Sequence, residues 1–296
     1  MPEAISEIAS ASFGMLPRND GKGFMTKIPI TVAGAGGKMG GRILTLASSD
    51  PELQITGALE RADSDVLGMD AGSLIGQDSL GVRVTSDLEE ALASSRVLID
   101  FTHPLAVEEH LEGALGAGVG MVIGTTGLSE KTLASLKRAS RRIAILQSPN
   151  MSTGVNLLFE LVTGLARILD ERFDIEITET HHRMKKDAPS GTALELAHLI
   201  ARTKGWDPKK AFLYGRRGQT GERKKKTIAI HALRGGDVVG EHTVSFLGNG
   251  EILELCHRAA SRDTFAAGAL LAAKFVARKK KGLYNMRNIW SLRGGR

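Results

Sequence analysis

The feature of the sequence that most constrains the fold is a glycine-rich turn that follows the first apolar segment. Residues 28–33 are apolar and predict a strand, and residues 42–48 continue with the periodicity of a helix. Between them, Gly34, Gly37 and Gly40 recur at every third position, a departure from the commoner G-x-G-x-x-G spacing. Glycines here permit a tight turn and let a phosphate approach the backbone at the helix N-terminus. Strand, turn and helix in this order predict the start of a dinucleotide-binding domain.

The segment after the turn supports the same interpretation. Residues 53–59 predict a second strand, and Glu60 and Arg61 follow it directly. An acid at this place can accept a hydrogen bond from the ribose 2′-hydroxyl of NADH, whereas an adjacent arginine can meet the 2′-phosphate of NADPH. The alternative is an exposed Glu-Arg pair in a loop. We therefore expect NADPH or NADH as the cofactor.

The rest of the first half alternates between strand and helix patterns. Strands are predicted at residues 82–85, 97–101, 121–124 and 143–147, and helices at residues 88–93, 106–117 and 129–138. This alternation predicts an α/β fold with a doubly wound parallel (Rossmann) sheet, in which ligands bind at the carboxyl ends of the strands. Two strand ends carry hydroxyl or amide groups that could face the nicotinamide, namely Gly124, Thr125 and Thr126, and Ser148, Pro149, Asn150 and Met151.

The pattern changes in the second half of the chain. After a predicted helix at residues 151–169, strand-like segments occur at residues 173–180, 227–233, 242–247 and 251–256, the last three joined by short turns that contain glycine. They predict a second, α+β domain on a mixed or antiparallel sheet. An alanine-rich helix at residues 263–278, capped by Ser261 or Asp263, returns to the first domain. We therefore expect a flexible N-terminal extension (1–26), a dinucleotide-binding domain (27–152 plus 262–296) and a substrate-binding and oligomerisation domain (153–261).

A dense cluster of ionisable side chains, six of seven residues, begins at His181 and includes His182 and Lys185. It follows a predicted strand and leads into Ser190, a predicted N-cap with Gly191 and Thr192 in the first helical turn. Basic side chains beside an open helix N-terminus favour a small carboxylate or phosphate. The alternative is a solvated basic loop. A zinc site is disfavoured, because adjacent histidines on a strand point to opposite faces.

The composition narrows the class of protein. The net charge is +6, but the basic clusters lack the interleaved aromatic residues that stack bases, so we expect no nucleic-acid partner. Cys256 is the only cysteine, which excludes an intrachain disulfide and a cysteine-rich metal site and fits a reducing compartment. No apolar run approaches the roughly 20 residues that a membrane helix needs. We expect a cytoplasmic protein without a metal or a membrane partner.

Taken together, the glycine turn, the Glu60-Arg61 pair, Gly124-Thr125-Thr126 and the segment E-T-H-H-R-M-K-K-D-A-P-S-G-T-A resemble one family. They are similar to bacterial 4-hydroxy-tetrahydrodipicolinate (dihydrodipicolinate) reductases, over about residues 28–286. The resemblance implies NAD(P)H-dependent reduction of 4-hydroxy-tetrahydrodipicolinate to tetrahydrodipicolinate with loss of water, in lysine and diaminopimelate biosynthesis. It also implies a homotetramer assembled through the second-domain sheets.

The resemblance also implies roles for individual residues. His181 corresponds to the acid/base histidine and Lys185 to the proton-donating lysine, while His182, Gly191 and Thr192 correspond to residues that bind the substrate. The cofactor-binding residues correspond to Gly34, Ala35, Gly36, Gly37, Lys38, Met39, Glu60, Arg61, Gly124, Thr125, Thr126, Ser148, Pro149, Asn150 and Met151. Two alternatives remain: another two-domain Rossmann dehydrogenase that acts on a small carboxylate, and a non-enzymatic NADPH sensor, which would not need His181 and Lys185.

Overall fold

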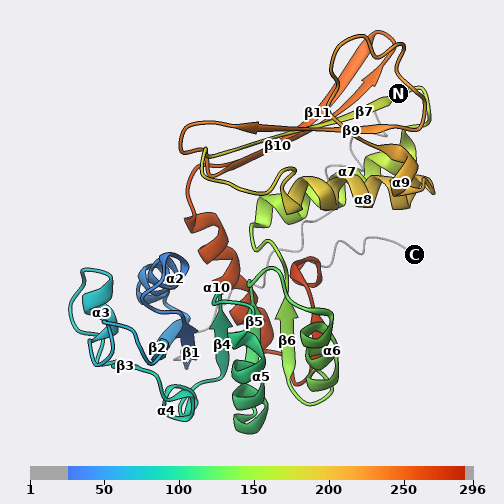
Figure 1. Cartoon of the computed structure of the whole chain (residues 1–296). Helices are drawn as coiled ribbons and strands as arrows, with labels where there is room; N and C mark the ends of the chain where they lie inside the picture. The colour runs from blue at the N-terminus through green and yellow to red at the C-terminus, as the bar shows by residue number, and fades with distance from the viewer. Residues whose placement is uncertain (1–25, 291–296) are drawn as a thin grey trace, which may run out of the picture.

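Two β-sheets organise the chain in the computed structural model, which describes residues 26–290 (Figure 1). The predicted N-terminal extension lies outside the described residues except for its last position. The larger sheet has seven strands in the order β12-β6-β5-β4-β1-β2-β3, and every neighbouring pair is parallel. Its strands are β1 (Ile28–Ala33), β2 (Leu53–Leu59), β3 (Val84–Thr85), β4 (Val97–Asp100), β5 (Gly120–Ile123), β6 (Ala144–Gln147) and β12 (Gly282–Tyr284). The strand order reverses direction at β1, so the predicted doubly wound sheet is confirmed.

Helices cover both faces of this sheet. They are α2 (Lys38–Ser48), α3 (Ala71–Leu74), α4 (Leu88–Leu92), α5 (Ala106–Ala117), α6 (Glu130–Ala139) and α10 (Asp263–Ala277). One core cluster joins α2 and α10 to the sheet, and a second joins α4, α5 and α6 to it. Because both faces are buried, the strands are nearly continuous apolar runs rather than alternating ones.

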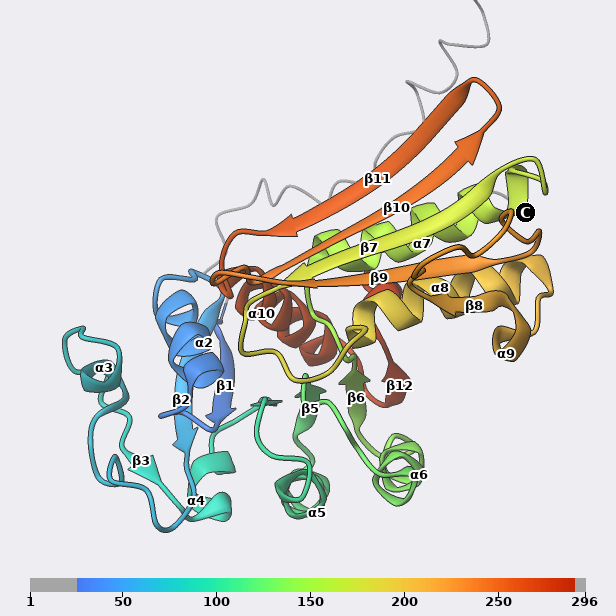
Figure 2. The same ribbon diagram turned by 45° about the horizontal axis from the view of Figure 1, so that its top comes forward.

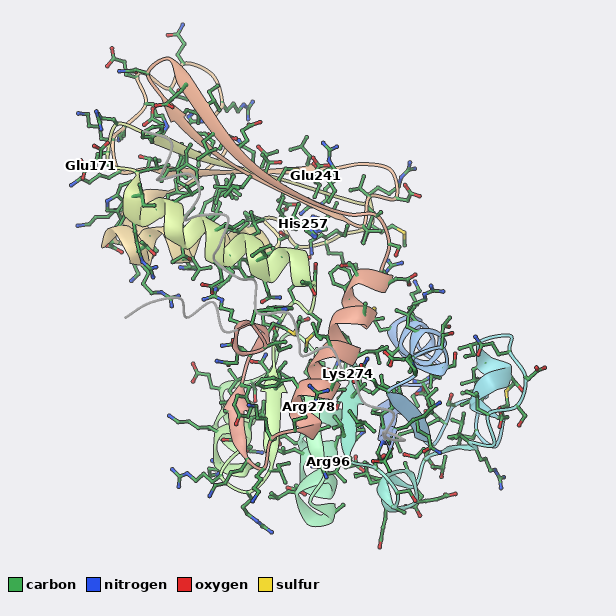
Figure 3. All side chains as sticks on the ribbon, turned by 180° about the vertical axis from the view of Figure 1, so that it is seen from behind. Arg96, Glu171, Glu241, His257, Lys274 and Arg278 are labelled. Atoms are coloured by element: carbon green, nitrogen blue, oxygen red, sulfur yellow. The ribbon has the colours of Figure 1, made fainter. Side chains whose placement is uncertain are left out.

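Helix α10 returns from the second half of the chain and packs on the larger sheet, as predicted. Its small residues let it lie close to the strands, and its far end is fixed by polar contacts (Figure 3). Lys274 Nζ lies 2.8 Å from both Asp50 Oδ2 and Glu52 Oε1, and Arg96 Nε donates to Ala277 O at 2.7 Å. The N-cap position is Arg262, not Ser261 or Asp263, but the predicted Ser261 does cap the helix through its Oγ, which accepts from Asp263 N at 3.1 Å.

The second sheet is mixed and has five strands in the order β11-β10-β7-β9-β8. The strands are β7 (Asp174–His181), β8 (Phe212–Tyr214), β9 (Ile228–Arg234), β10 (Gly240–Gly248) and β11 (Glu251–Ala259). β7 pairs in parallel with β9 and antiparallel with β10. Helices α7 (Thr153–Ile168) and α8 (Gly191–Lys204) lie together on one face and build its core (Figure 2). Within residues 26–290, no helix is both long and apolar enough to cross a membrane.

Most predicted elements occur within a few residues of their expected limits, and the misses are short. β8, β12, α3 and α9 (Pro208–Ala211) have three or four residues each, too few for a periodic pattern to identify them. β11 extends to Ala259, three residues beyond the predicted end, because it pairs with the whole length of β10. Pairing with a neighbouring strand, rather than the local pattern, sets that boundary.

Candidate functional site

The glycine turn after β1 has the geometry that a dinucleotide requires. Gly34 has φ +72°, a conformation that residues with a side chain rarely adopt. A Cβ at Gly40 would lie 2.0 Å from the Gly34 carbonyl oxygen, so the start of α2 can pack this closely only with glycine there. The N-cap is Gly37, and no side chain of the described residues caps it. The first turn of α2 therefore presents free N–H groups, which fit a pyrophosphate.

A cavity of about 640 Å³ opens beside this turn. Its lining includes six of the predicted cofactor residues, Gly34, Gly37, Lys38, Met39, Glu60 and Arg61, together with Thr102, His103 and His110. Glu60 Oε2 accepts a hydrogen bond from Gly36 N at 3.0 Å, so the carboxylate lies against the glycine turn. The Arg61 side chain is largely exposed, with Nε 3.2 Å from Asp63 Oδ1. This arrangement can accept either a ribose hydroxyl or a phosphate at the cavity mouth.

Of the other predicted cofactor residues, all outside the lining of this cavity, Ala35 and Gly36 lie within the glycine turn, and segments 124–126 and 148–151 lie at the ends of the neighbouring strands β5 and β6. Ser148 N donates to Ile123 O, the last residue of β5, at 3.1 Å, which holds segment 148–151 beside segment 124–126. Thr125 Oγ1 donates to Thr102 O at 3.1 Å. The structure therefore joins these two segments to each other and, through Thr102, to the cavity.

Asp100, at the end of β4, is a buried carboxylate to which no sequence motif gave a role. It accepts hydrogen bonds from Thr102 N at 2.9 Å and Thr102 Oγ1 at 2.7 Å, and its Oδ2 lies 2.7 Å from His110 Nδ1. Burial raises the pKa of Asp100, but the hydrogen bonds from His110 and Thr102 outweigh this and hold the pKa below its usual value. His110 is ten residues away on α5, so no local motif identifies the pair.

On the second sheet, β7 ends at the predicted acid/base histidine. Alternate residues of β7 face the core, and this inward row changes from Ile175 and Ile177 to Glu179 and His181. His181 Nδ1 lies 2.5 Å from Glu179 Oε2, and the Glu179 side chain is completely buried. Burial lowers the pKa of His181 more than Glu179 raises it. His181 is therefore neutral near pH 7, with a buried carboxylate at one ring nitrogen.

After His181 the chain turns back, which brings Lys185 to the same end of the sheet. Lys185 N donates to His182 O at 3.1 Å, and His182 N donates to Val238 O at 2.8 Å. Lys185 Nζ lies 2.8 Å from Asp187 Oδ1, with the lysine side chain 20% exposed. The turn supplies the change in direction that brings Lys185, four residues further along the chain, to the same end of the sheet as His181.

A second cavity, of about 580 Å³, connects the turn after β7 with the glycine turn of the larger sheet. Its lining is rich in cationic side chains and comprises Lys38, His182, Arg183, Met184, Gly236, Asp237 and Arg262. Lys38 is a predicted cofactor residue and His182 a predicted substrate residue, so one cavity contains a member of each group. The positive lining suits anionic ligands.

The N-terminus of α8 has the predicted form. Ser190 is the N-cap, and its Oγ accepts from Ala193 N at 3.2 Å. Thr192 Oγ1 accepts from Asn150 Nδ2 at 3.2 Å, which links a predicted substrate residue to a predicted cofactor residue. Within the described part of the chain, no atom lies within 4 Å of the position that a Cβ at Gly191 would take. The first turn of α8 therefore faces open space.

Three residues to which no sequence pattern gave a role, Glu179, Arg234 and His242, hold this site together. Arg234 Nη1 and Nη2 each lie 2.8 Å from a Glu179 oxygen. His242 Nε2 lies 3.0 Å from Ser190 Oγ, and its ring packs edge-on against His181 with centroids 5.1 Å apart. Burial, followed by the neighbouring His181, lowers the pKa of His242 to about 3. Glu179 is the first residue of the segment E-T-H-H-R-M-K-K-D-A-P-S-G-T-A, and strand alternation in β7 places residues 179 and 181 on one face, but neither signal gave it a role.

Comparison with known proteins gives a consistent result. Residues 28–151 match the family described as dihydrodipicolinate reductase, N-terminus, and residues 154–290 match dihydrodipicolinate reductase, C-terminus. The chain is 48% identical over 272 residues to the 4-hydroxy-tetrahydrodipicolinate reductase of Anaeromyxobacter dehalogenans (strain 2CP-1), covering 92% of this chain and 100% of that protein. It is also 48% identical over 269 residues to the enzyme of the same name from Nitrosomonas europaea, covering 91% and 100%.

A solved structure of dipicolinate-bound dihydrodipicolinate reductase from Paenisporosarcina sp. TG-14 is similar with a TM-score of 0.73 and 27% identity, covering 89% of this chain and 100% of the other. A probable dehydrogenase from Thermotoga maritima shares the fold alone, with a TM-score of 0.57 and 8% identity, covering 88% of this chain and 92% of the other. The family matches cover both sheets. The chain belongs to the dihydrodipicolinate reductase family.

Proposed function

We infer that this chain reduces 4-hydroxy-tetrahydrodipicolinate to tetrahydrodipicolinate, with loss of water, as an NAD(P)H-dependent oxidoreductase of lysine and diaminopimelate biosynthesis. The observation that carries this function is the contact between Asn150 Nδ2 and Thr192 Oγ1, at 3.2 Å. It places the end of the dinucleotide-binding sheet beside the helix N-terminus and the His181–Lys185 turn. A site with an anion-binding helix end, a proton donor and a neighbouring dinucleotide cleft suits reduction of a dicarboxylate.

In this proposal, one carboxylate of the substrate binds at the start of α8. The first turn of this helix contains no acidic residue, and Glu179 Oε1 takes up only the N–H of the N-cap Ser190, so the N–H groups of the first turn keep the positive partial charge of the helix dipole. The N–H groups near Gly191 and the Thr192 hydroxyl hold the carboxylate, and His182 contacts the ring. The similar reductase from Paenisporosarcina likewise binds a small carboxylate, dipicolinate.

Bound NADH or NADPH supplies the hydride. The fit for the cofactor rests on the open first turn of α2, the 640 Å³ cavity and the Glu60-Arg61 pair at its mouth. Gly34 to Met39 hold the pyrophosphate, and the segments 124–126 and 148–151 position the nicotinamide. Glu60 favours a 2′-hydroxyl and Arg61 a 2′-phosphate, so both dinucleotides bind.

Two residues handle protons. Lys185, whose Nζ lies 2.8 Å from Asp187 Oδ1, donates the proton that completes reduction. His181 is its acid/base partner. Because Nδ1 of His181 is bound to Glu179, proton exchange takes place at Nε2.

The function is tested by NADPH oxidation, followed by absorbance, on addition of the product of the preceding synthase reaction. We expect turnover by the natural chain and its loss in His181→Gln. Oxidation that does not depend on the dicarboxylate would point to another dehydrogenase, and binding of NADPH without any oxidation would point to a sensor.

We also propose a cytoplasmic homotetramer that assembles through the second sheets, and a division into domains 27–152 plus 262–296 and 153–261. The outer strand β11 supports the tetramer, because Ile252 is 63% and Leu253 39% exposed at the edge of the sheet. Light scattering should give four times the chain mass of 31.6 kDa. Ile252→Asp should lower this mass, and a monomeric natural chain would contradict the assembly.

A further inference from the structure

Glu179 is the point at which three parts of the site meet. Its Oε1 accepts from Ser190 N at 2.9 Å and from Arg234 Nη2 at 2.8 Å, and its Oε2 lies 2.8 Å from Arg234 Nη1 and 2.5 Å from His181 Nδ1. The donors belong to β7, to β9 and to the N-cap of α8. A buried carboxylate is costly unless its oxygens are satisfied, and here both oxygens have two donors.

The contacts fix the chemical state of Glu179. Arg234 forms a two-pronged ion pair with it, which compensates the buried negative charge. Burial raises the pKa of Glu179, but the hydrogen bonds from Arg234 and His181 outweigh this and lower it. The carboxylate therefore stays ionised and does not itself take up a proton during the reaction.

The same contacts fix the tautomer of His181. An ionised carboxylate can only accept a hydrogen bond, so Nδ1 of His181 carries a proton and Nε2 is the ring atom that is free to exchange one. Nε2 faces Gly240 of β10, where an added Cβ would lie 3.0 Å away. Because residue 240 is glycine, it has no side chain that would press against Nε2.

The network continues to the proton-donating lysine. Arg234 Nη2 donates to Asp187 O at 2.6 Å, and the Asp187 carboxylate pairs with Lys185 Nζ. The charged or titratable groups that surround His181 from the packed elements are Glu179, Lys185, Asp187, Arg234 and His242. Displacement of the Glu179 carboxylate would disturb the histidine, the lysine loop and the helix end together.

We propose that Glu179 is the positioning residue of this site, which holds His181 as the Nδ1–H tautomer and fixes it relative to the carboxylate-binding start of α8. The catalytic part of this proposal rests on the reductase function inferred above. The tautomer itself follows from the Glu179–His181 contact, which does not involve the substrate.

Glu179→Gln tests the assignment because it changes the charge with little change in shape. A glutamine amide cannot accept all four hydrogen bonds. If its oxygen stays with Ser190 N, its NH₂ group faces His181 Nδ1 and favours the Nε2–H tautomer. We expect kcat to fall by about a hundredfold or more, as for a triad histidine left in the wrong tautomer, with the cofactor Kd within about twofold of the natural value. The limb of the pH–kcat profile that belongs to His181 should move.

Two further variants separate positioning from folding. Glu179→Asp keeps the charge and should recover at least about tenfold of the activity that Glu179→Gln loses. Glu176→Gln is the matched control, because Glu176 lies on the same strand and binds Arg216, Arg223 and His231, but faces away from α8. Its kcat should be that of the natural enzyme.

The direct measurement is the ¹⁵N spectrum of histidine-labelled protein, with His181 assigned by its absence in His181→Gln. The natural chain should show His181 protonated at Nδ1, and Glu179→Gln should show the proton moved to Nε2. An unchanged tautomer, or a kcat for Glu179→Gln within about threefold of natural, overturns the proposal. If the natural chain failed to turn over the dicarboxylate, the proposed function would fail, while the spectrum would still decide the tautomer.

Discussion

Each of the two sheets contains one fully buried carboxylate that holds a histidine. Asp100 binds His110 Nδ1 at 2.7 Å at the end of β4, and Glu179 binds His181 Nδ1 at 2.5 Å at the end of β7. The remaining partners differ. Within residues 26–290, the other donors to Asp100 are hydroxyl and backbone groups, whereas Glu179 is paired with an arginine.

The difference in partners indicates different roles for the two carboxylates, a structural one for Asp100 and one in the proposed reaction for Glu179. Asp100 holds Thr102, which lines the cavity beside the glycine turn, and Thr125, which lies next to Thr102 outside that lining. Glu179 has its charge balanced by Arg234, and burial lowers the pKa of the adjacent His181 more than Glu179 raises it, so His181 is neutral near pH 7. Changes around Glu179 should therefore alter catalysis, and changes around the first-sheet cavity should alter cofactor affinity.

The largest expected effect is on the proton-handling residues. His181→Gln and Lys185→Met should each lower kcat by about 10²–10⁴, because each removes a group that transfers a proton in the transition state. NADPH Kd, measured by fluorescence titration, should stay unchanged. The double variant should lose far less than the product of the single effects. A near-normal kcat in either single variant would remove that residue from the mechanism.

A second variant tests the anion site alone. Gly191→Val places its side chain in open space within the protein, so the fold should tolerate it, but the methyl groups would occupy the path of the substrate carboxylate. KM should rise by about 10–100-fold, the cost of one or two lost charged hydrogen bonds. The NADPH Kd is the control. A lower cofactor affinity with unchanged KM would assign the start of α8 to the other ligand.

Local sequence patterns predicted the turns, caps and strands around both carboxylates, but not the long-range contacts that set the pKa values and positions of the site residues. The glycine turn, the predicted N-cap Ser190 and the two sheets all follow from residues close in sequence. Arg234 lies 55 residues from Glu179, and His242 lies 52 residues from Ser190. Such pairs meet only because β9 and β10 flank β7, and strand order is not encoded in any one segment.

The third prediction concerns the loss of folding stability in acid, which should arise at the second sheet, around His242. Burial lowers the pKa of His242 to about 3. At a pH below the ordinary histidine pKa of about 6.5, the unfolded chain therefore binds more protons than the folded chain. This contribution to stability is complete above pH of about 6.5 and is lost as the pH falls. Between pH 7 and pH 5 it amounts to about 2 kcal/mol of the free energy of unfolding.

Urea denaturation at both pH values measures this loss. His242→Gln should make the loss smaller by that amount, while His198→Gln, which replaces an exposed histidine of α8, is the matched control. An equal loss in the natural chain and in His242→Gln would show that His242 does not carry the acid sensitivity.

The smallest expected effect is on cofactor affinity, at the cavity beside the first sheet. Arg61 is exposed at the mouth of the cofactor cavity, where a 2′-phosphate would meet it in solvent. Arg61→Ala should raise the NADPH Kd by about tenfold, the value of one charged contact, and leave the NADH Kd and kcat almost unchanged. Equal weakening of both dinucleotides would show that Arg61 does not read the 2′-phosphate.

The central claim is that hydride passes from a dinucleotide on the first sheet to a dicarboxylate held by the second. It is tested most directly with NADPH deuterated at C4 of the nicotinamide, on the face that is transferred, and mass spectrometry of the product. We predict one deuterium in each tetrahydrodipicolinate formed, with one NADPH oxidised per product. Product without the label, or label found only in the cofactor, would contradict the claim.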